Sequence, residues 1–282
     1  MNYRHAFHAG NFADVFKHAV LTRLVDYLRR KEAGFRVYDT HAGAGNYDLL
    51  SDEARRGGEW RHGIARLFKA PLSEASRQLL APYLAACGTD PATGEIRAYP
   101  GSPSLVRSML RKQDRLSAYE TDEAEYARLA QLLGGDFQAR TTRLDGWLVA
   151  GAHLPPKESR GLMFIDPPFE TSDDFAHIFD TLAKAHQRWA GGMVAAWYPV
   201  KQKSMLDTFR ILVCDTGPPD VIDVRFSVGE PKEGGELVAC GMLIKNPPFV
   251  LEQELRILLP ELVRILGRDG AADFAIERLT EE

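Results

Sequence analysis

Cysteine is scarce in this sequence of 282 residues, which contains only Cys87, Cys214 and Cys240. No two of them form a CxxC pair, and three are too few to cross-link a chain of this length, so the composition fits a reducing compartment. The sequence also lacks an apolar run of roughly 18 residues, which a membrane span needs, and an N-terminal apolar core of the signal-peptide type. We therefore expect a cytoplasmic protein with no membrane partner.

An overall excess of basic residues is also missing, because the net charge is −4. The charge is nevertheless uneven. Residues 1–36 contain seven Lys and Arg against three acids, a local charge of +4, while the remainder carries −8. A small basic face can bind a phosphate backbone locally, although a solvated basic helix explains the same composition. The seven basic residues are Arg4, Lys17, Arg23, Arg29, Arg30, Lys31 and Arg36.

The chain has no internal repeat and no low-complexity segment, and its apolar segments alternate with stretches of helical periodicity. Seven segments read as strands: the start of 35–45, and 115–120, 137–143, 161–166, 192–199, 221–227 and 237–246. Helical stretches at 122–133, 173–190 and 201–212 separate most of them. This alternation predicts an α/β fold with a mostly parallel, seven-stranded sheet. Residues 228–236 are too short for a crossover helix, so the last two strands should form an antiparallel hairpin.

Two further helical regions define the expected domain organisation. Apolar residues recur at helical spacing over 12–31, so residues 1–34 should form an N-terminal helical segment. Residues 47–98 are also helical in periodicity, with glycine-rich and proline-containing breaks. We interpret 47–98 as a small helical subdomain inserted into one α/β domain made of residues 1–46 and 99–282.

A glycine-rich turn, DTHAGAG, follows the first predicted strand at residues 39–45. Gly43 and Gly45 allow tight turning and close approach of the backbone to a ligand. Asp39 precedes them at the spacing of the D/E-x-G-x-G-x-G turn of S-adenosylmethionine (SAM) methyltransferases, with His41 in the first glycine position. Glu120 ends the next strand, where an acid can accept both ribose hydroxyls. A nicotinamide dehydrogenase usually has that acid about 20 residues after the glycines, whereas here the predicted insertion separates them.

Two more acids follow predicted strands at the edge where ligands bind in open α/β sheets. Asp145, before Gly146, is placed to accept a hydrogen bond from the cofactor's adenine amine, although an Asp-Gly turn is common in any protein. Asp166 opens the sequence DPPF after the fourth strand. Its carboxylate and the carbonyl oxygen of Pro167 could accept the hydrogens of an adenine amine, and Phe169 could stack on a flipped-out base.

Two remaining motifs receive weaker interpretations. NPPF at 246–249 resembles DPPF but lies on the last predicted strand, so we interpret Asn246 as part of an ordinary turn. The N-terminal histidines lack a supporting acid or cysteine pattern for a metal site, and we expect no metal. His18 and Lys17 are better candidates for contacts with the cofactor carboxylate or RNA phosphate, and Tyr3 could stack on a base.

The sequence resembles the 23S ribosomal RNA adenine-N6 methyltransferases of the RlmJ family. The resemblance extends over nearly the whole chain and rests on YRHAFHAGNFADVFKH, DTHAGAG, YPGSP, Glu120, the DG at 145–146, IDPPF, WYPV and NPPF. It implies a Rossmann-like class I fold in which SAM contacts His18, His41, Ser102, Glu120, Asp145, Gly146 and Asp166, and we add Gly43 of the glycine turn as a cofactor contact. It also implies a catalytic role for Asp166 and an RNA contact from Tyr3, to which we add its neighbour Arg4. The family's aromatic residue is usually tyrosine where this chain has Phe169, so stacking is retained but a hydroxyl is not.

We therefore expect a SAM-dependent enzyme that methylates N6 of an adenine in 23S rRNA, acting as a monomer on naked RNA or an early assembly particle. Within the same class, a DNA adenine or protein glutamine methyltransferase could use the same turn. From other classes, a nicotinamide dehydrogenase gives no reason for DPPF. A non-catalytic RNA-binding protein would not need the ordered acids Asp39, Glu120, Asp145 and Asp166.

Overall fold

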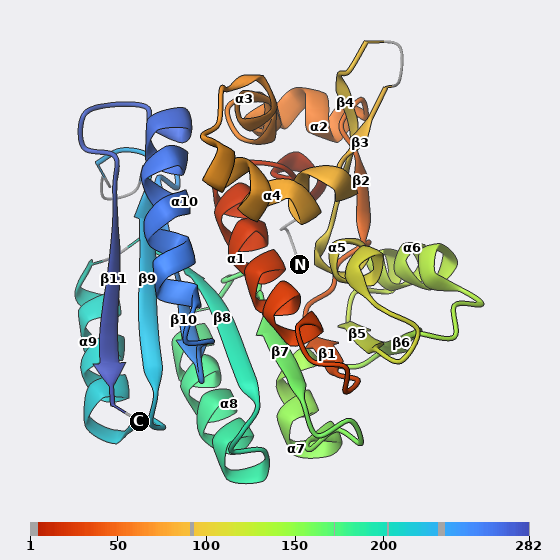
Figure 1. Ribbon diagram of the computed structural model, residues 1–282, viewed down its shortest axis with the longest axis vertical. Coiled ribbons are helices and arrows are strands. Elements are labelled where there is room, and N and C mark those ends of the chain that lie inside the picture. Colours follow the sequence, from red (N-terminus) through yellow and green to blue (C-terminus); the bar gives the residue numbers. More distant parts are fainter. Residues whose placement is uncertain (1–4, 91–92, 172, 202, 231–234, 282) are drawn as a thin grey trace.

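A mixed sheet of eight strands forms the centre of the computed structural model, which describes residues 5–90, 93–171, 173–201, 203–230 and 235–281 (Figure 1). β1 pairs in parallel with β5 and β7, and β10 runs antiparallel to both β8 and β9. The predicted fold class is confirmed, including the C-terminal hairpin of β9 and β10. In spatial order the strands are β11 (Asp273–Thr280), β9 (Val221–Ser227), β10 (Ala239–Lys245), β8 (Met193–Pro199), β7 (Gly161–Ile165), β1 (Arg36–Asp39), β5 (Arg115–Glu120) and β6 (Ala139–Arg143).

The expected count of seven strands was wrong by one, because β11 adds an eighth strand antiparallel to β9. β11 lies at the edge of the sheet and contacts both α9 and α10. Phe274 and Ile276 pack against the core, whereas Glu277 and Arg278 are exposed. A half-exposed edge strand of this kind has no continuous apolar run, so its sequence signal is weak.

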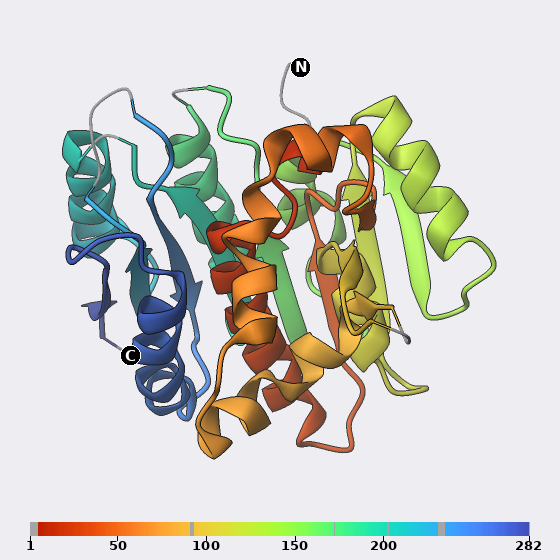
Figure 2. The same cartoon turned by 90° about the horizontal axis from the view of Figure 1, so that it is seen from above.

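Successive residues of the central strands point to opposite faces of the sheet and build two separate cores. Leu162 and Phe164 of β7 belong to one core, and Met163 and Ile165 belong to the other. α1, α5 and α10 cover the first face, and α7, α8 and α9 cover the second. Figure 2 shows α1 and α10 on one side of the sheet and α8 and α9 on the other. The bounds are α1 (Phe12–Arg29), α5 (Ser102–Met109), α6 (Glu123–Leu133), α7 (Val149–His153), α8 (Asp174–Arg188), α9 (Lys203–Thr216) and α10 (Leu251–Leu266), with 3-10 turns η1 (His5–Phe7) and η3 (Gly146–Leu148).

The buried helix α1 passes from the cavity described below to the opposite end of the sheet. Its first turn is capped by Asn11, whose side-chain oxygen accepts a hydrogen bond from the Asp14 N–H at 2.9 Å. Most of its residues are buried between the sheet, α5 and α10. No helix within the described ranges has the length and apolarity that crossing a bilayer requires.

The chain between β1 and α5 leaves the sheet at Gly45 and returns to the same point at Gly101. The Gly101 N–H donates to the Gly45 carbonyl at 3.0 Å, and a Cβ on Gly101 would lie 3.1 Å from that backbone. The elements in between are β2 (Asn46–Asp48), α2 (Asp52–Gly57), η2 (Glu59–Arg61), α3 (Ile64–Lys69), α4 (Glu74–Ala86), β3 (Gly88–Thr89) and β4 (Ile96–Pro100). The helices agree with the predicted content of 47–98, but the three-stranded sheet β2-β4-β3 was not expected, because its strands are too short to leave a periodic pattern. We propose to treat 47–98 as an inserted subdomain.

Candidate active site

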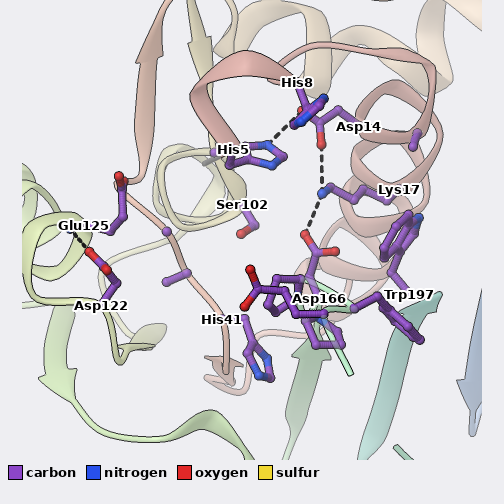
Figure 3. Close-up of a pocket in the computed structure, with 18 of the residues that line it drawn as sticks. His5, His8, Asp14, Lys17, His41, Ser102, Asp122, Glu125, Asp166 and Trp197 are labelled. Carbon is purple, nitrogen blue, oxygen red and sulfur yellow. Dashed lines mark hydrogen bonds and ion pairs between the residues drawn. The ribbon is translucent and has the colours of Figure 1, made fainter. Parts of the chain in front are cut away.

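The carboxyl ends of β1, β5, β6 and β7 lie at one edge of the sheet, beside a cavity of about 850 Å³. This is where ligands bind in open α/β sheets. Every predicted site residue that the structure describes lines this cavity: Lys17, His18, His41, Gly43, Ser102, Glu120, Asp145, Gly146, Asp166, Pro167 and Phe169. Tyr3 and Arg4, which we predicted to contact RNA, lie outside the described residues. Residues far apart in the chain thus share one site, as Lys17 and Asp166 do in the close-up (Figure 3).

Gly43 forms the floor of a tight turn in which only glycine fits. Its φ is +59°, a left-handed conformation, and a Cβ would lie 2.4 Å from the Tyr47 hydroxyl. The Gly43 N–H donates to Glu120 Oε2 at 2.8 Å, so the turn after β1 is tied to the end of β5. The two predicted cofactor residues therefore belong to one rigid cradle.

Glu120 is partly engaged by the backbone around it. Oε1 accepts from the N–H groups of Thr121 and Asp122 at 2.7 and 2.8 Å, in addition to the bond between Oε2 and Gly43. Burial raises the pKa of Glu120, and these three N–H groups oppose the rise. A carboxylate has about four acceptor positions, so one position remains for a ligand hydroxyl, fewer than the two that we expected.

Asp145, Gly146 and His41 form the opposite wall of the cavity. A Cβ on Gly146 would lie 2.1 Å from the Thr40 carbonyl oxygen, so only glycine allows this approach of two loops. Asp145 caps η3 by accepting from the Trp147 N–H at 3.0 Å, and the Trp147 ring lies edge-on to His41 with centroids 4.8 Å apart. Burial lowers the pKa of His41 to about 4, so its ring is neutral at pH 7.

Asp39, the acid of the glycine turn, is fully buried and is not among the residues that line the cavity. Burial, together with the nearby carboxylates of Asp166 and Glu120, raises the pKa of Asp39 to about 7, against the opposing effects of Ser102 and Lys17. Its position beneath the turn makes Asp39 part of the support for the site.

Asp166 lies at the end of β7 and forms an ion pair with Lys17 of α1. Lys17 Nζ is 2.6 Å from Asp166 Oδ2 and 2.8 Å from Asp14 Oδ1, and its side chain is only 6% exposed. Figure 3 shows the ammonium between the two carboxylates. The Asp166 side chain keeps 13% of its surface exposed, toward the cavity that it lines. One carboxylate is thus fixed by a buried cation and still accessible to a ligand.

Asp14 continues this chain of charges toward η1. It accepts from the Gly10 N–H at 2.7 Å and lies 3.0 Å from His5 Nε2. Burial alone would raise the pKa of Asp14, but the charges of His5 and Lys17 outweigh burial and hold that pKa well below its usual range. The row His5, Asp14, Lys17 and Asp166 therefore links the start of the described chain to the end of β7.

Residues 32–277 match the family described as "Ribosomal RNA large subunit methyltransferase D, RlmJ". The chain is 37% identical over 282 residues to the "Ribosomal RNA large subunit methyltransferase J" of Escherichia coli (strain K12), with the whole of both chains covered. It is 34% identical over 284 residues to the protein of the same name from Haemophilus influenzae, again over both whole chains. The chain belongs to the RlmJ family. The crystal structure of protein LPL1258 from Legionella pneumophila covers 96% of this chain and 98% of its own, with a TM-score of 0.86 at 30% identity.

Membership of the RlmJ family confirms the family prediction, and the structure separates the two PPF motifs as their strands predicted. β10 runs antiparallel to β8, so Asn246 at its end lies at the opposite edge of the sheet from Asp166. Asn246 Nδ2 donates to the carbonyl oxygens of Ala190 and Gly192 at 2.6 and 2.9 Å. It lines a separate cavity of about 190 Å³, away from Asp166.

Phe169 has both a packed side and a side that lines the cavity. Its ring is half-buried and lies edge-on to Phe175 and Trp197, with centroids 5.2 and 5.8 Å away. Its φ of +49° is left-handed, which is uncommon for a bulky residue. The position therefore combines core packing with exposure to a ligand.

The described part of residues 1–36 does not present its basic residues on one face, which was one of the two alternatives that their composition left open. Lys17 and Arg23 are buried, and Arg23 pairs with Asp26 and Glu254, both at 2.8 Å. Arg29 and Arg30 are at the far end of α1, about 18 Å from Lys17 at the rise of 1.5 Å per residue. Because Lys17 and Arg23 pair with acids inside the protein and Arg29, Arg30 and Lys31 lie together at the far end of α1, a charge count could not locate an RNA surface.

Sequence reasoning missed several residues that complete the site. Trp197 has its ring centroid 5.5 Å from Lys17 Nζ, and its signals were its place near the end of a predicted strand and the motif WYPV. Asp14 could have been found, since it lies one helical turn before Lys17. Among the described residues, no group of three or more His, Cys, Asp or Glu could hold a metal ion.

Proposed function

We propose that this member of the RlmJ family is a SAM-dependent methyltransferase that methylates N6 of an adenine in 23S ribosomal RNA. The observation that carries the proposal is the position of Asp166 and Pro167 at the carboxyl end of β7. There they line the cavity that also contains the glycine cradle and the acids at the ends of β5 and β6. The family and the names of the two full-length relatives supply the class of substrate.

The residues of the cavity fit SAM in size and in chemistry. Gly43 and Gly146 allow close packing of the turns beside the cavity, and a cavity of about 850 Å³ can hold both SAM and a flipped-out base. Glu120 retains an acceptor position for a ribose hydroxyl, and Asp145 can accept from the adenine amine through the oxygen that does not cap η3. We assign His18 and Ser102 to the methionine part of the cofactor and His41 to the wall beside its adenine.

Methyl transfer to an exocyclic amine requires hydrogen-bond acceptors, because the nitrogen lone pair is delocalised into the adenine ring. SAM supplies an electrophilic methyl group on a positively charged sulfur. Asp166 would accept one N6 hydrogen and the Pro167 carbonyl oxygen the other, which draws the nitrogen toward tetrahedral geometry. As the N–CH₃ bond formed, the S–CH₃ bond would break and leave a neutral thioether. The nitrogen would then lose one proton, which the Asp166 carboxylate can accept before passing it to water.

Lys17 would act by holding Asp166 in position, rather than by contacting RNA as we first expected. Its ammonium fixes Asp166 Oδ2, so Oδ1 remains the oxygen that can face the amine. Phe169 and Trp197 would provide the apolar surface against which the target base lies, since base–aromatic stacking contributes about 1–3 kcal/mol. The enzyme would meet its substrate in the cytoplasm as a monomer, on naked RNA or an early assembly particle.

The proposal is tested by incubating the protein and labelled SAM with 23S rRNA from a strain that lacks the enzyme, followed by mass mapping of the product. We expect one N6-methyladenosine at a single position. Duplex DNA containing adenine and a glutamine-containing peptide serve as alternative substrates. Methylation of either one, with none on the RNA, would transfer the same chemistry to another substrate class and refute the proposal.

A further inference from the structure

Three buried aromatic side chains form a continuous row that ends at the cavity. Tyr83 Oη lies 2.8 Å from Tyr99 Oη, and Tyr99 Oη lies 2.8 Å from His18 Nδ1. The Tyr99 ring also stacks on the His18 ring, with centroids 5.5 Å apart and an angle of 19°. All three side chains are at most 1% exposed, yet His18 lines the cavity.

The direction of the hydrogen bonds in this row follows from counting hydrogens. Each hydroxyl carries one hydrogen, and a buried hydrogen without an acceptor is costly. If Tyr83 donates to Tyr99 and Tyr99 donates to His18 Nδ1, both hydroxyl hydrogens have acceptors. In the reverse direction, His18 would donate to Tyr99 and Tyr99 to Tyr83, and the Tyr83 hydrogen would have no acceptor among the described residues. The first direction is therefore favoured.

The surroundings keep all three groups uncharged. Burial raises the pKa of Tyr83 and of Tyr99 well above the usual range, so both hydroxyls retain their hydrogens. Burial also lowers the pKa of His18 to about 3, since the raising effect of Asp14 does not offset burial and the charges of Lys17 and His5. A neutral imidazole that accepts at Nδ1 carries its single hydrogen on Nε2.

We propose that Tyr99, supported by Tyr83, is a positioning residue that holds His18 as the Nε2–H tautomer, so that His18 donates a hydrogen bond to the carboxylate of SAM. This inference rests on the proposed function, because it takes SAM as the ligand. Tyr83 belongs to α4 and Tyr99 to β4, both between Gly45 and Gly101. The segment between Gly45 and Gly101 therefore takes part in cofactor binding, although Tyr83 and Tyr99 do not line the cavity.

The tautomer can be measured directly by long-range ¹H–¹⁵N correlation spectra of the cofactor-free protein, in which protonated and unprotonated ring nitrogens differ in ¹⁵N shift. The His18 signals are assigned by their absence in His18→Gln. We expect the Nε2–H tautomer in the wild type and in Tyr83→Phe, where Tyr99 can still donate. In Tyr99→Phe we expect a mixture of tautomers. A wild type with the hydrogen on Nδ1 would overturn the inference.

Calorimetry of SAM binding then tests the consequence of the tautomer. Tyr99→Phe should weaken SAM binding by roughly three- to ten-fold, the change expected for one neutral hydrogen bond, and Tyr83→Phe should weaken it less. Both variants lose one buried hydroxyl, so Tyr83→Phe controls for general loss of packing, and thermal melts confirm folding.

A double-mutant cycle separates the tautomer from other effects of Tyr99. The side chain introduced by His18→Gln presents an amide N–H that does not depend on a tautomer, so Tyr99→Phe should have little effect on SAM affinity in that background. An equal effect of Tyr99→Phe in both backgrounds would contradict the inference. Neither the NMR spectra nor the calorimetry uses RNA. A protein that met both expectations but methylated no rRNA would therefore refute the proposed function and leave this inference intact.

Discussion

Replacing Lys17 with methionine should both destabilise the protein and slow methyl transfer. Methionine retains an unbranched apolar stem of similar length, so the main change is the loss of the ammonium between two carboxylates. In the wild type this ammonium lies 2.8 Å from Asp14 and 2.6 Å from Asp166. Without it, two buried or half-buried acids would face each other with no cation between them.

The size of the effect on stability follows from the burial of the three groups. Removing one partner of a buried ion pair costs about 3–5 kcal/mol. Asp14 retains His5 and the Gly10 N–H, and Asp166 is 13% exposed, so we expect a loss near the lower end, about 3 kcal/mol. Methyl transfer should fall about 100-fold, which is the cost of a misplaced reacting group.

Urea unfolding of Lys17→Met, Asp166→Asn and the double variant measures the coupling. The double variant should be more stable than the sum of the single effects predicts by at least about 1 kcal/mol, because the neutral amide introduced by Asp166→Asn needs no cation. Lys31→Met serves as a control, since Lys31 is exposed and its loss should change stability by less than about 0.5 kcal/mol. Additive single effects, or a Lys17→Met variant as stable and active as the wild type, would refute this account of the pair.

Three further predictions concern the aromatic residue, a buried histidine and the N-terminus. Phe169→Tyr should keep the rate of single-turnover methylation within a few-fold of the wild type, and Phe169→Ala should lower it roughly ten- to hundred-fold. If the activity of Phe169→Ala falls only in step with its melting temperature, Phe169 serves core packing alone. The pKa of His41 is lowered to about 4, below the unfolded value of 6.5. As the pH falls from 6.5 to about 4, the wild type should therefore lose up to about 1.4 kcal/mol of unfolding free energy per pH unit more than His41→Gln loses. Equal slopes of unfolding free energy against pH, measured by urea unfolding, would contradict this. Deletion of residues 1–4 should lower RNA turnover and make the affinity for RNA less dependent on salt, while SAM binding measured by calorimetry stays near normal. Unchanged turnover would leave Tyr3 and Arg4 without a role.

Patterns within single strands and turns were enough to predict most of the fold. The apolar runs that end at Asp39 and Asp166 are buried parallel strands, and the hairpin followed from a connection too short for a helix. The tight turn predicted at Gly43 is also present, with a left-handed φ of +59°. The edge strand β11 was missed because exposed Glu277 and Arg278 interrupt its apolar residues, so its sequence pattern is weak.

The interior of the site could not be predicted, because it depends on partners that are distant in sequence. Lys17 reads as a surface cation until α1 is placed beside the end of β7, which lies far along the chain. The contact of His18 with Tyr99 likewise requires the inserted segment to fold back onto α1. Glu120 was predicted as a free acceptor, but the turn after β1 already uses part of its carboxylate.

The most direct test of the central claim compares Asp166→Ala with Asn246→Ala in single-turnover methylation of 23S rRNA. Both residues precede Pro-Pro-Phe, yet only Asp166 lines the large cavity. The account predicts that Asp166→Ala abolishes methylation while it stays folded by circular dichroism, and that Asn246→Ala retains most of the activity. Equal loss in two folded variants, or an active Asp166→Ala, would contradict it.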